Sequence, residues 1–181
     1  ISQGQGGLLD IQLDPNYKNN GWIYFSYASN LENDGNGANT AIARGKLTGT
    51  SLSNLEVLYK ATPNTKKGQH FGSRIVFDKN GYLYFSIGDR GNRDELPQDI
   101  TKDGGKIYRI NSDGSIPESN PFYNKAGAKK AIFCYGNRNP QGMAIHPETG
   151  EVWAHEHGPK GGDEINIIKS GKNYGWPKAS Y

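Results

Sequence analysis

The segment that decides the fold is Gly72-Ser73-Arg74-Ile75-Val76-Phe77-Asp78-Lys79, followed closely by Tyr82-Leu83-Tyr84-Phe85-Ser86. It consists of a glycine, a short apolar run, a polar turn and a second run rich in aromatic residues. Short alternating runs bounded by Gly, Asn and Asp are typical of β-hairpins. Neither run carries a sustained helical period, so the segment predicts two antiparallel strands.

The same hairpin pattern recurs on both sides of this segment. The two further copies are Gly7–Pro15 with Trp22–Tyr27, and Gln141–Pro147 with Val152–Ala154. Asp14, Asp78 and His146 hold the turn position in the three copies and stand 64 and 68 residues apart. A hairpin that recurs at such a period, with further strands between the copies, indicates the blades of a β-propeller. An ordinary meander or sandwich with coincidental similarity is the alternative.

The rest of the chain reads as strands of the same kind. The expected strands are Gly21–Ala28, Ile42–Leu47, Leu55–Tyr59, Arg74–Phe77, Tyr82–Ile87, Lys106–Ile110, Ala131–Tyr135, Gly142–Ile145, Val152–Ala154 and Glu164–Ile168. A composition of 25 glycines, 9 prolines and 11 tyrosines in 181 residues suits many strands joined by tight turns. We therefore predict an all-β chain in which residues 1–181 belong to one domain.

Composition also excludes several classes of function. The formal net charge of +3, from 21 basic and 18 acidic residues, is too small and too mixed for a nucleic-acid interface. No run approaches the ~18–20 apolar residues of a membrane-spanning helix. The single cysteine, Cys134, excludes an intrachain disulfide, and its apolar neighbours Ala131–Tyr135 predict a buried, inert thiol.

Polar groups recur at one phase of the repeat. Gln5, His70 and Arg138 stand eight or nine residues before the turn positions, and Asp89-Arg90 and His157-Gly158 stand eleven or twelve residues after the last two. The first strand of a hairpin begins at the end where the second strand finishes. These groups are therefore predicted to ring one mouth of the propeller channel, where loops from several blades converge on a site.

The first segment that could carry chemistry is Gly68–Arg74, in which His70 stands close to glycines at the start of a strand. A histidine exposed there can titrate near neutral pH, although a lone histidine is also consistent with a structural role.

Other common motifs for catalysis or ligand binding are missing from the sequence. The chain has no nucleophile elbow, no P-loop and no strand-linked dinucleotide motif. Asn33–Gly37 hints at a calcium loop but lacks the remaining ligands, so we expect a flexible turn there.

The second segment, Tyr135–Gly142, contains Arg138, Asn139 and Gln141. Their fork-like donors and amide groups suit a planar ligand that is rich in carbonyl and carboxylate oxygens. A polar turn in which Asn and Pro satisfy backbone groups is the alternative.

The third segment, His155–Asn166, suggests a cation site. His155 and His157 would share one face of a strand, as a two-histidine metal site requires. The same segment offers bare carbonyl groups in Gly-Pro and Gly-Gly pairs, together with the carboxylates of Asp163 and Glu164. Oxygen ligands of this kind suit calcium better than zinc.

Together these motifs resemble the soluble pyrroloquinoline-quinone (PQQ) sugar dehydrogenases of the glucose/sorbosone dehydrogenase family, especially its bacterial aldose sugar dehydrogenase branch. The motifs that carry the resemblance are, in chain order, Gly4–Leu9, Gln69–Gly72, Ile87–Asp89, Arg138–Gly142, Glu156–Pro159 and Gly171–Pro177. Each motif is short, but the set in this order runs along the whole chain and is specific.

The resemblance implies a six-bladed β-propeller with PQQ and calcium at the channel mouth, of which this chain holds about half the blades. It implies oxidation of aldose sugars to lactones, an external electron acceptor, and a periplasmic or secreted location. His70 would be the general base that takes the proton of the anomeric hydroxyl while hydride passes to the quinone. A histidine suits this role because its unperturbed pKa lies near working pH.

The resemblance also assigns the other site residues by their position in the motifs. The expected quinone contacts are Arg138, Asn139, Gln141 and His157. The expected substrate contacts are Gln5 and Arg90. The backbone carbonyls of Gly158 and Pro159 would hold the catalytic calcium, which polarises the quinone carbonyl, and Glu164 and Tyr174 would bind a second, structural calcium.

Some positions depart from the family pattern. Gln69 stands where glucose-oxidising relatives carry an acidic partner to the histidine, and His157 and Arg90 each replace a glutamine of some relatives. At Gln69 and His157 the chain resembles the aldose sugar dehydrogenase branch, whereas Arg90 leaves the range of sugars open. Full family members continue for roughly as long again, and that part supplies the Lys and Arg clamp on the quinone carboxylates. We therefore expect this chain to be a piece of a larger propeller.

Two functions other than sugar oxidation fit parts of the sequence. One is a propeller of the same family that binds or signals without a quinone. The other is a carbohydrate-binding lectin. His70 and the group from Arg138 to Gln141 favour the enzyme, because neither alternative requires them.

Overall fold

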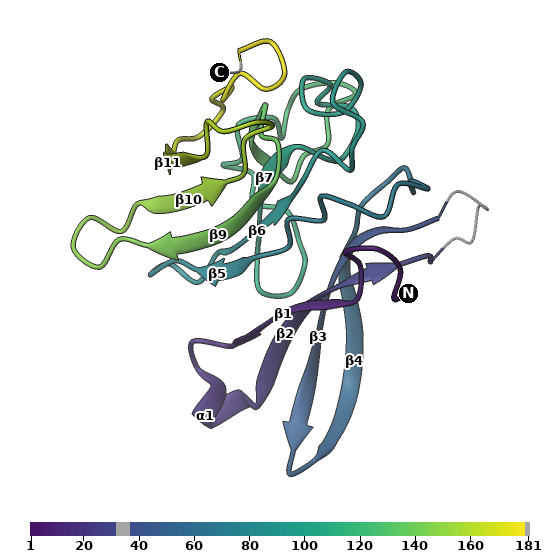
Figure 1. Cartoon of the computed structure of the whole chain (residues 1–181). Helices are drawn as coiled ribbons and strands as arrows, with labels where there is room; N and C mark the ends of the chain where they lie inside the picture. The colour runs from purple at the N-terminus through teal and green to yellow at the C-terminus, as the bar shows by residue number, and fades with distance from the viewer. Residues whose placement is uncertain (32–36, 180–181) are drawn as a thin grey trace.

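The computed structural model describes residues 1–31 and 37–179, which form three antiparallel sheets (Figure 1). Every run predicted as a strand is a strand, so the all-β prediction is confirmed. The one helix of the described residues, α1 (Tyr17–Asn20), is a single turn that the sequence analysis did not predict. Asn33–Asn36, most of the expected flexible turn, lie outside the described residues.

Each sheet is a meander, in which strands that follow one another along the chain are hydrogen-bonded neighbours. The first sheet contains β1 (Leu8–Leu13), β2 (Trp22–Ser29), β3 (Asn39–Thr48) and β4 (Ser51–Lys60). The second contains β5 (Ile75–Phe77), β6 (Leu83–Ile87), β7 (Lys106–Ile110) and β8 (Ile132–Tyr135). The third contains β9 (Pro140–Ile145), β10 (Val152–Glu156) and β11 (Glu164–Ile168).

The connections of the first hairpin in all three sheets begin with the same hydrogen bonds, although they differ in length. The N–H groups of the turn residues donate to carbonyls at or just before the start of the second strand, in the pairs Asp14 with Trp22, Asp78 with Tyr82, and His146 with Glu151. The side chain of each turn residue also accepts the N–H two positions further on, at 2.8, 2.9 and 3.3 Å respectively. Side chains that bond to the backbone two residues on stabilise tight turns. The repeated hairpin predicted from the sequence is therefore confirmed.

Two buried clusters join the sheets, and strand β6 contributes to both. Leu83 and Phe85 lie in the cluster shared with the first sheet, where Phe85 stacks on Tyr108 with ring centres 4.8 Å apart. Tyr84 lies in the other cluster, with Met143 and further residues of the third sheet. Successive side chains of a strand point to opposite faces, so this strand can fill both cores. The second sheet is thus packed on both of its faces.

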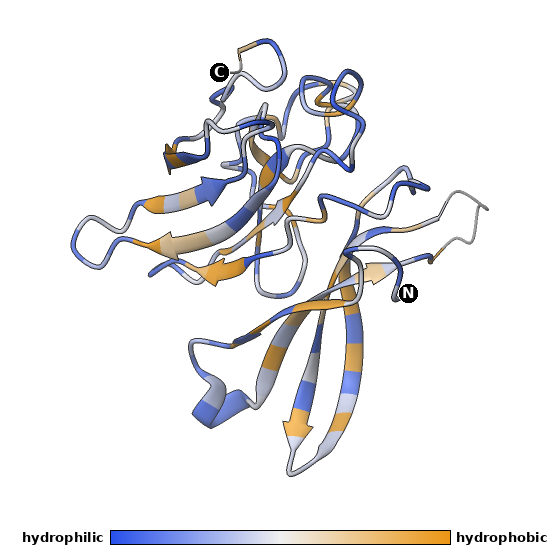
Figure 2. Cartoon of the chain, in the orientation of Figure 1, coloured by the Kyte–Doolittle hydropathy of each residue, from blue (hydrophilic) through white to orange (hydrophobic). Residues whose placement is uncertain are grey.

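The first and third sheets each retain exposed apolar side chains. On β4, hydrophobic and hydrophilic positions alternate (Figure 2), and Leu55 and Val57 are 62% and 49% exposed. On β11, Ile165 is 75% exposed. Strands that alternate in this way normally bury their apolar face against another layer.

Two further predictions concern Cys134 and membrane-spanning helices. Cys134 is buried, and burial raises the pKa of its thiol, which makes the group inert as predicted. Across residues 1–31 and 37–179, no helix combines the length and the apolar character needed to cross a membrane.

Candidate functional site

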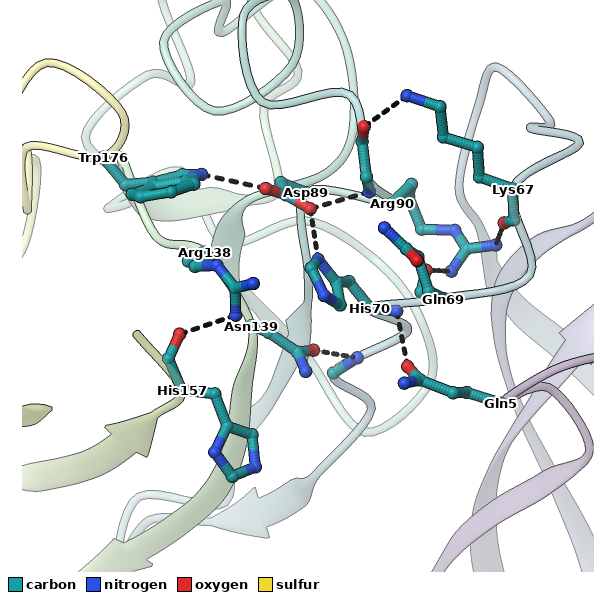
Figure 3. A network of polar contacts seen from close by, with 12 residues as sticks. Gln5, Lys67, Gln69, His70, Asp89, Arg90, Arg138, Asn139, His157 and Trp176 are labelled. Atoms are coloured by element: carbon teal, nitrogen blue, oxygen red, sulfur yellow. Dashed lines mark hydrogen bonds and ion pairs between the residues drawn. The ribbon is translucent and has the colours of Figure 1, made fainter. Parts of the chain in front are cut away.

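The loops predicted to meet at one end of the hairpins do meet there (Figure 3). The N–H of Gln5 donates to the carbonyl of Gly68 at 2.7 Å, and the N–H of Asp89 donates to the carbonyl of Arg138 at 2.7 Å. The first bond joins the segments that precede β1 and β5, and the second joins the segment after β6 to the segment before β9. The polar residues read from the repeat therefore form one cluster.

His70 is held in a defined orientation at the centre of this cluster. Its backbone is left-handed, with φ of 55°, a conformation that is uncommon for residues other than glycine. Its N–H donates to Oε1 of Gln5 at 2.7 Å, and its ring Nδ1 lies 2.7 Å from Oδ1 of Asp89. Nε2 has no hydrogen-bond partner within the described residues, and the side chain is 14% exposed.

Asp89 is the residue that sets the chemistry of this imidazole. Its carboxylate is 1% exposed and also accepts the N–H of Gly91 at 2.7 Å and the indole N–H of Trp176 at 2.8 Å. Burial raises the pKa of Asp89, but these donors together with His70 outweigh burial and lower it. A carboxylate that accepts from Nδ1–H leaves a lone pair on Nε2, so His70 is arranged as a base.

The four predicted quinone contacts lie together beside His70. The Arg138 guanidinium donates to the carbonyl of His157 at 3.0 Å, and Nε2 of His157 lies 3.0 Å from Oε1 of Gln141. Asn139 is 3% exposed, and its side-chain oxygen accepts the N–H of Gly72 at 3.2 Å. Asn139 thus connects this group to the loop that carries His70. The remaining donors suit a ligand rich in oxygen atoms, as predicted from residue type.

Glu156 is a residue of this site that the sequence analysis did not single out. Its buried carboxylate accepts the N–H groups of Arg138 at 2.5 Å and Asn139 at 3.2 Å, and the side-chain amide of Asn137 at 2.8 Å. Burial raises its pKa, and the nearby Glu164 raises it further. The signal available in the sequence was its place in the motif Glu156–Pro159, immediately before His157.

The residues predicted to bind two calcium ions line one small cavity. Gly158, Pro159, Glu164 and Tyr174 all border it, together with Glu156. A Cβ on Gly158 would lie 2.0 Å from the carbonyl oxygen of Gly161, so only glycine fits at this position. The lining includes the carboxyl groups of Glu156 and Glu164 beside glycines, and carboxylate and carbonyl oxygens are the ligands that calcium prefers.

Two details limit how these residues could hold a metal. The Tyr174 hydroxyl donates to the carbonyl of Ile167 at 2.7 Å and accepts the N–H of Lys169 at 2.8 Å, so both roles of its hydroxyl are already used. Within the described ranges, no group of three or more His, Cys, Asp or Glu side chains is placed to hold a metal. The alternative site of two histidines is not supported either, because His155 and His157 border different cavities and the His155 ring packs directly on Gly142.

The two predicted substrate contacts have different surroundings. Gln5 is exposed at the mouth, although its side-chain oxygen is bonded to the amide of His70. Arg90 is 0% exposed, and its guanidinium is bonded to main-chain carbonyls behind the His70 loop. A fully buried side chain bonded to main-chain carbonyls presents no exposed group to a ligand, so the structure does not support a substrate contact by Arg90.

Comparison with known proteins gives matches along the whole chain. The glucose/sorbosone dehydrogenase family matches residues 1–181. Aldose sugar dehydrogenase YliI of Escherichia coli (strain K12) is 43% identical over 99% of this chain and 48% of that protein. Quinoprotein glucose dehydrogenase B of Acinetobacter calcoaceticus is 35% identical over 99% of this chain and 41% of that protein.

A solved structure supports the same relationship. The PQQ-bound form of aldose sugar dehydrogenase from Streptomyces coelicolor matches with a TM-score of 0.83 and 34% identity, over 99% of this chain and 51% of that chain. This chain thus spans about half the length of the relatives that it matches. The match covers every motif of the site, and the chain belongs to the glucose/sorbosone dehydrogenase family.

Proposed function

We propose that the full-length protein containing this chain oxidises aldose sugars to lactones with PQQ as its cofactor, and passes the electrons to an external acceptor. The observation that carries the proposal is the 2.7 Å contact between Nδ1 of His70 and the buried carboxylate of Asp89. This contact sits beside Arg138, Gln141 and His157, which suit an oxygen-rich ligand.

The same proposal includes the architecture. The three sheets would be three consecutive blades of one six-bladed propeller domain, to which residues 1–181 contribute about half. The repeated turn at Asp14, Asp78 and His146 supports equivalent units. The apolar side chains left exposed on β4 and β11 are suited to packing against further blades.

His70 would act as the general base of the reaction. Its Nε2 would take the proton of the anomeric hydroxyl as hydride leaves the same carbon, and Asp89 would stabilise the imidazolium that forms. Trp176 and Gly91 hold the carboxylate of Asp89 in place for this task. PQQ, when bound, supplies the hydride acceptor.

The other residues of the site would bind and orient the quinone and the calcium ions. Arg138, Asn139, Gln141 and His157 would hold the quinone, and Glu156 would fix the backbone of the segment that carries the first two. The carbonyl oxygens of Gly158 and Pro159 would hold a calcium ion as a Lewis acid at this end of the site. Glu164 and the main chain of Tyr174 are proposed as ligands of a second calcium. A periplasmic or secreted location stays a prediction.

The test is reconstitution of the full-length protein with PQQ and calcium, followed by dye reduction with a panel of aldoses. We expect reduction that depends on the sugar and on the quinone, and that falls when calcium is removed by a chelator. Absence of dye reduction with every aldose would refute the proposal. Sugar binding without dye reduction would instead identify a lectin, and binding of neither sugar nor quinone would favour a signalling propeller.

A further inference from the structure

We propose that Arg90 is a positioning residue for His70, and that its guanidinium sets the geometry of the base rather than contacting the sugar. This inference rests on the proposed function, since it assumes that His70 is the base. It departs from the substrate role that the family resemblance implies for Arg90. Three features carry it, namely the bonds of the guanidinium, the backbone of His70, and the burial of the charge.

The guanidinium binds the loop on both sides of His70. It donates to the carbonyl of Gln69, and to those of Lys67 at 3.0 Å and Ala38 at 3.3 Å. Its central carbon lies 3.4 Å from the centre of the Phe71 ring, where a cation is attracted by the ring face. Since Gln69 and Phe71 are the chain neighbours of His70, Arg90 fixes the peptide units that orient the imidazole.

The backbone of His70 needs such support. A left-handed conformation costs roughly 1 kcal/mol or more for a residue with a side chain, and persists where the surroundings impose it. Gln5 holds the N–H of His70 from one side, while Arg90 holds the preceding carbonyl from the other. Lys67 closes the arrangement, because its ammonium group donates to the carbonyl of Gly91 at 2.5 Å. The loop of His70 and the loop of Asp89 are thereby fastened together.

Burying the charged guanidinium of Arg90 costs free energy. Burial lowers the pKa of Arg90 to about 10, although the neighbouring Asp89 raises it, so the group keeps its charge at neutral pH. Its Nε is buried without a hydrogen-bond partner in the part of the chain that the structure describes. A buried cation with an unsatisfied donor is unfavourable unless its other contacts compensate. Here the contacts with Lys67, Gln69 and Phe71 lead to the His70 loop, and the contact with Ala38 ties the same guanidinium to the first sheet's side of it.

The test compares Arg90→Gln with wild type in the reconstituted full-length protein. A glutamine side chain cannot span the three carbonyls, so we expect kcat to fall roughly 10- to 100-fold while the KM for the sugar stays nearly constant. Arg109→Gln is the matched control, because Arg109 also packs on aromatic rings and bonds to Asn120 but lies away from His70. A raised KM with unchanged kcat, or no effect on either constant, would overturn the inference.

A second variant and a second readout cover the other outcomes. If Arg90→Gln does not fold, Arg90→Lys keeps the charge and some donors, and we expect a smaller loss of kcat at constant KM.

The readout that does not depend on activity is the NMR spectrum of the full-length protein labelled with 15N-histidine, with His70 assigned from the spectrum of His70→Ala. The His70 ring signals should shift in the Arg90 variants and not in Arg109→Gln. Unchanged His70 signals would refute the inference, whereas inactive wild type would refute only the proposed function.

Discussion

At the scale of residues, the site is built around one imidazole and the buried groups that surround it. Asp89 is hidden from solvent and receives donors from His70, Gly91 and Trp176. Arg138, Gln141 and His157 would contact ligands, while the buried partners of His70 determine how its imidazole is oriented. This division predicts that substitutions in the buried part affect catalysis without removing any ligand contact.

Replacing Asp89 with Asn tests this division directly. The amide keeps the size of the side chain but loses the negative charge that stabilises the imidazolium. We expect kcat to fall by roughly 10² to 10⁴ in the full-length enzyme, and the acid limb of the kcat/KM profile to move to lower pH. The measurement is steady-state dye reduction across pH, with Asp113→Asn, an exposed turn residue, as the control. Wild-type rates and an unmoved acid limb would contradict the role of Asp89.

The sequence predicted the exposed residues of the site better than the buried ones. His70, Arg138 and His157 stand at one phase of the repeat, and their residue types suggest what they bind. The repeat also placed Asp89 in this ring, but the pairing of Asp89 with His70 and the role of Glu156 depend on contacts between segments far apart in the chain, which a single sequence does not display. Arg90 was expected on the substrate side from the family resemblance, and its burial could not be read from its residue type.

At the scale of elements, the strands and the hairpin turns follow from local sequence, whereas the long loops do not. Residues 88–105 and 111–131 contain few regular elements, and their courses are set by tertiary contacts. Lys106 shows how the first of these loops is fixed. Its buried ammonium donates to the carbonyls of Leu96 at 2.6 Å and Gly104 at 2.7 Å, at the far end of the loop that begins beside Asp89.

Lys106 makes stability depend on pH in a defined direction. Burial lowers its pKa to about 7, although Asp103 and Asp99 raise it. Between pH 7 and the ordinary lysine pKa of 10.5, the unfolded chain therefore binds more protons than the folded chain. The free energy of unfolding should therefore rise with pH across this range. In Lys106→Met the free energy of unfolding should rise less with pH, because the lysine that causes the rise is gone. Urea unfolding of the full-length protein at pH 7 and pH 9.5 measures this difference.

The control for Lys106→Met is Lys79→Met, because Lys79 is exposed in the turn of the second sheet. That variant should keep the pH dependence of wild type. An equal pH dependence in Lys106→Met and wild type would show that the folded and unfolded states do not differ in the protonation of Lys106.

At the scale of the whole molecule, the chain spans about half the length of the relatives that it matches. Leu55 on β4 and Ile165 on β11 expose apolar surface on the two outer sheets. His70, the proposed base, and the cavity bordered by Gly158 and Glu164 are formed by loops at the ends of the described strands. In the proposed propeller, the remaining blades would cover the exposed faces and add basic groups for the quinone carboxylates.

This division predicts how the isolated chain behaves toward the quinone. Residues 1–181 without the remainder should bind PQQ far more weakly than the full-length protein, because in the proposed propeller the other blades would supply basic groups for the quinone carboxylates. Calorimetric titration of both proteins with PQQ in the presence of calcium is the measurement. Equal affinity in the two would show that this chain already contains every important quinone contact.

The central claim is that His70 is the base in a reaction that reduces a bound quinone. The most direct measurement is the rate of quinone reduction in a single turnover, for wild-type full-length protein and for His70→Ala, both loaded with PQQ and calcium and mixed rapidly with an aldose. The account predicts a rate roughly 10² to 10⁴ lower in the variant, with the affinity for PQQ retained. A variant that reduces its quinone at nearly the wild-type rate would contradict the account.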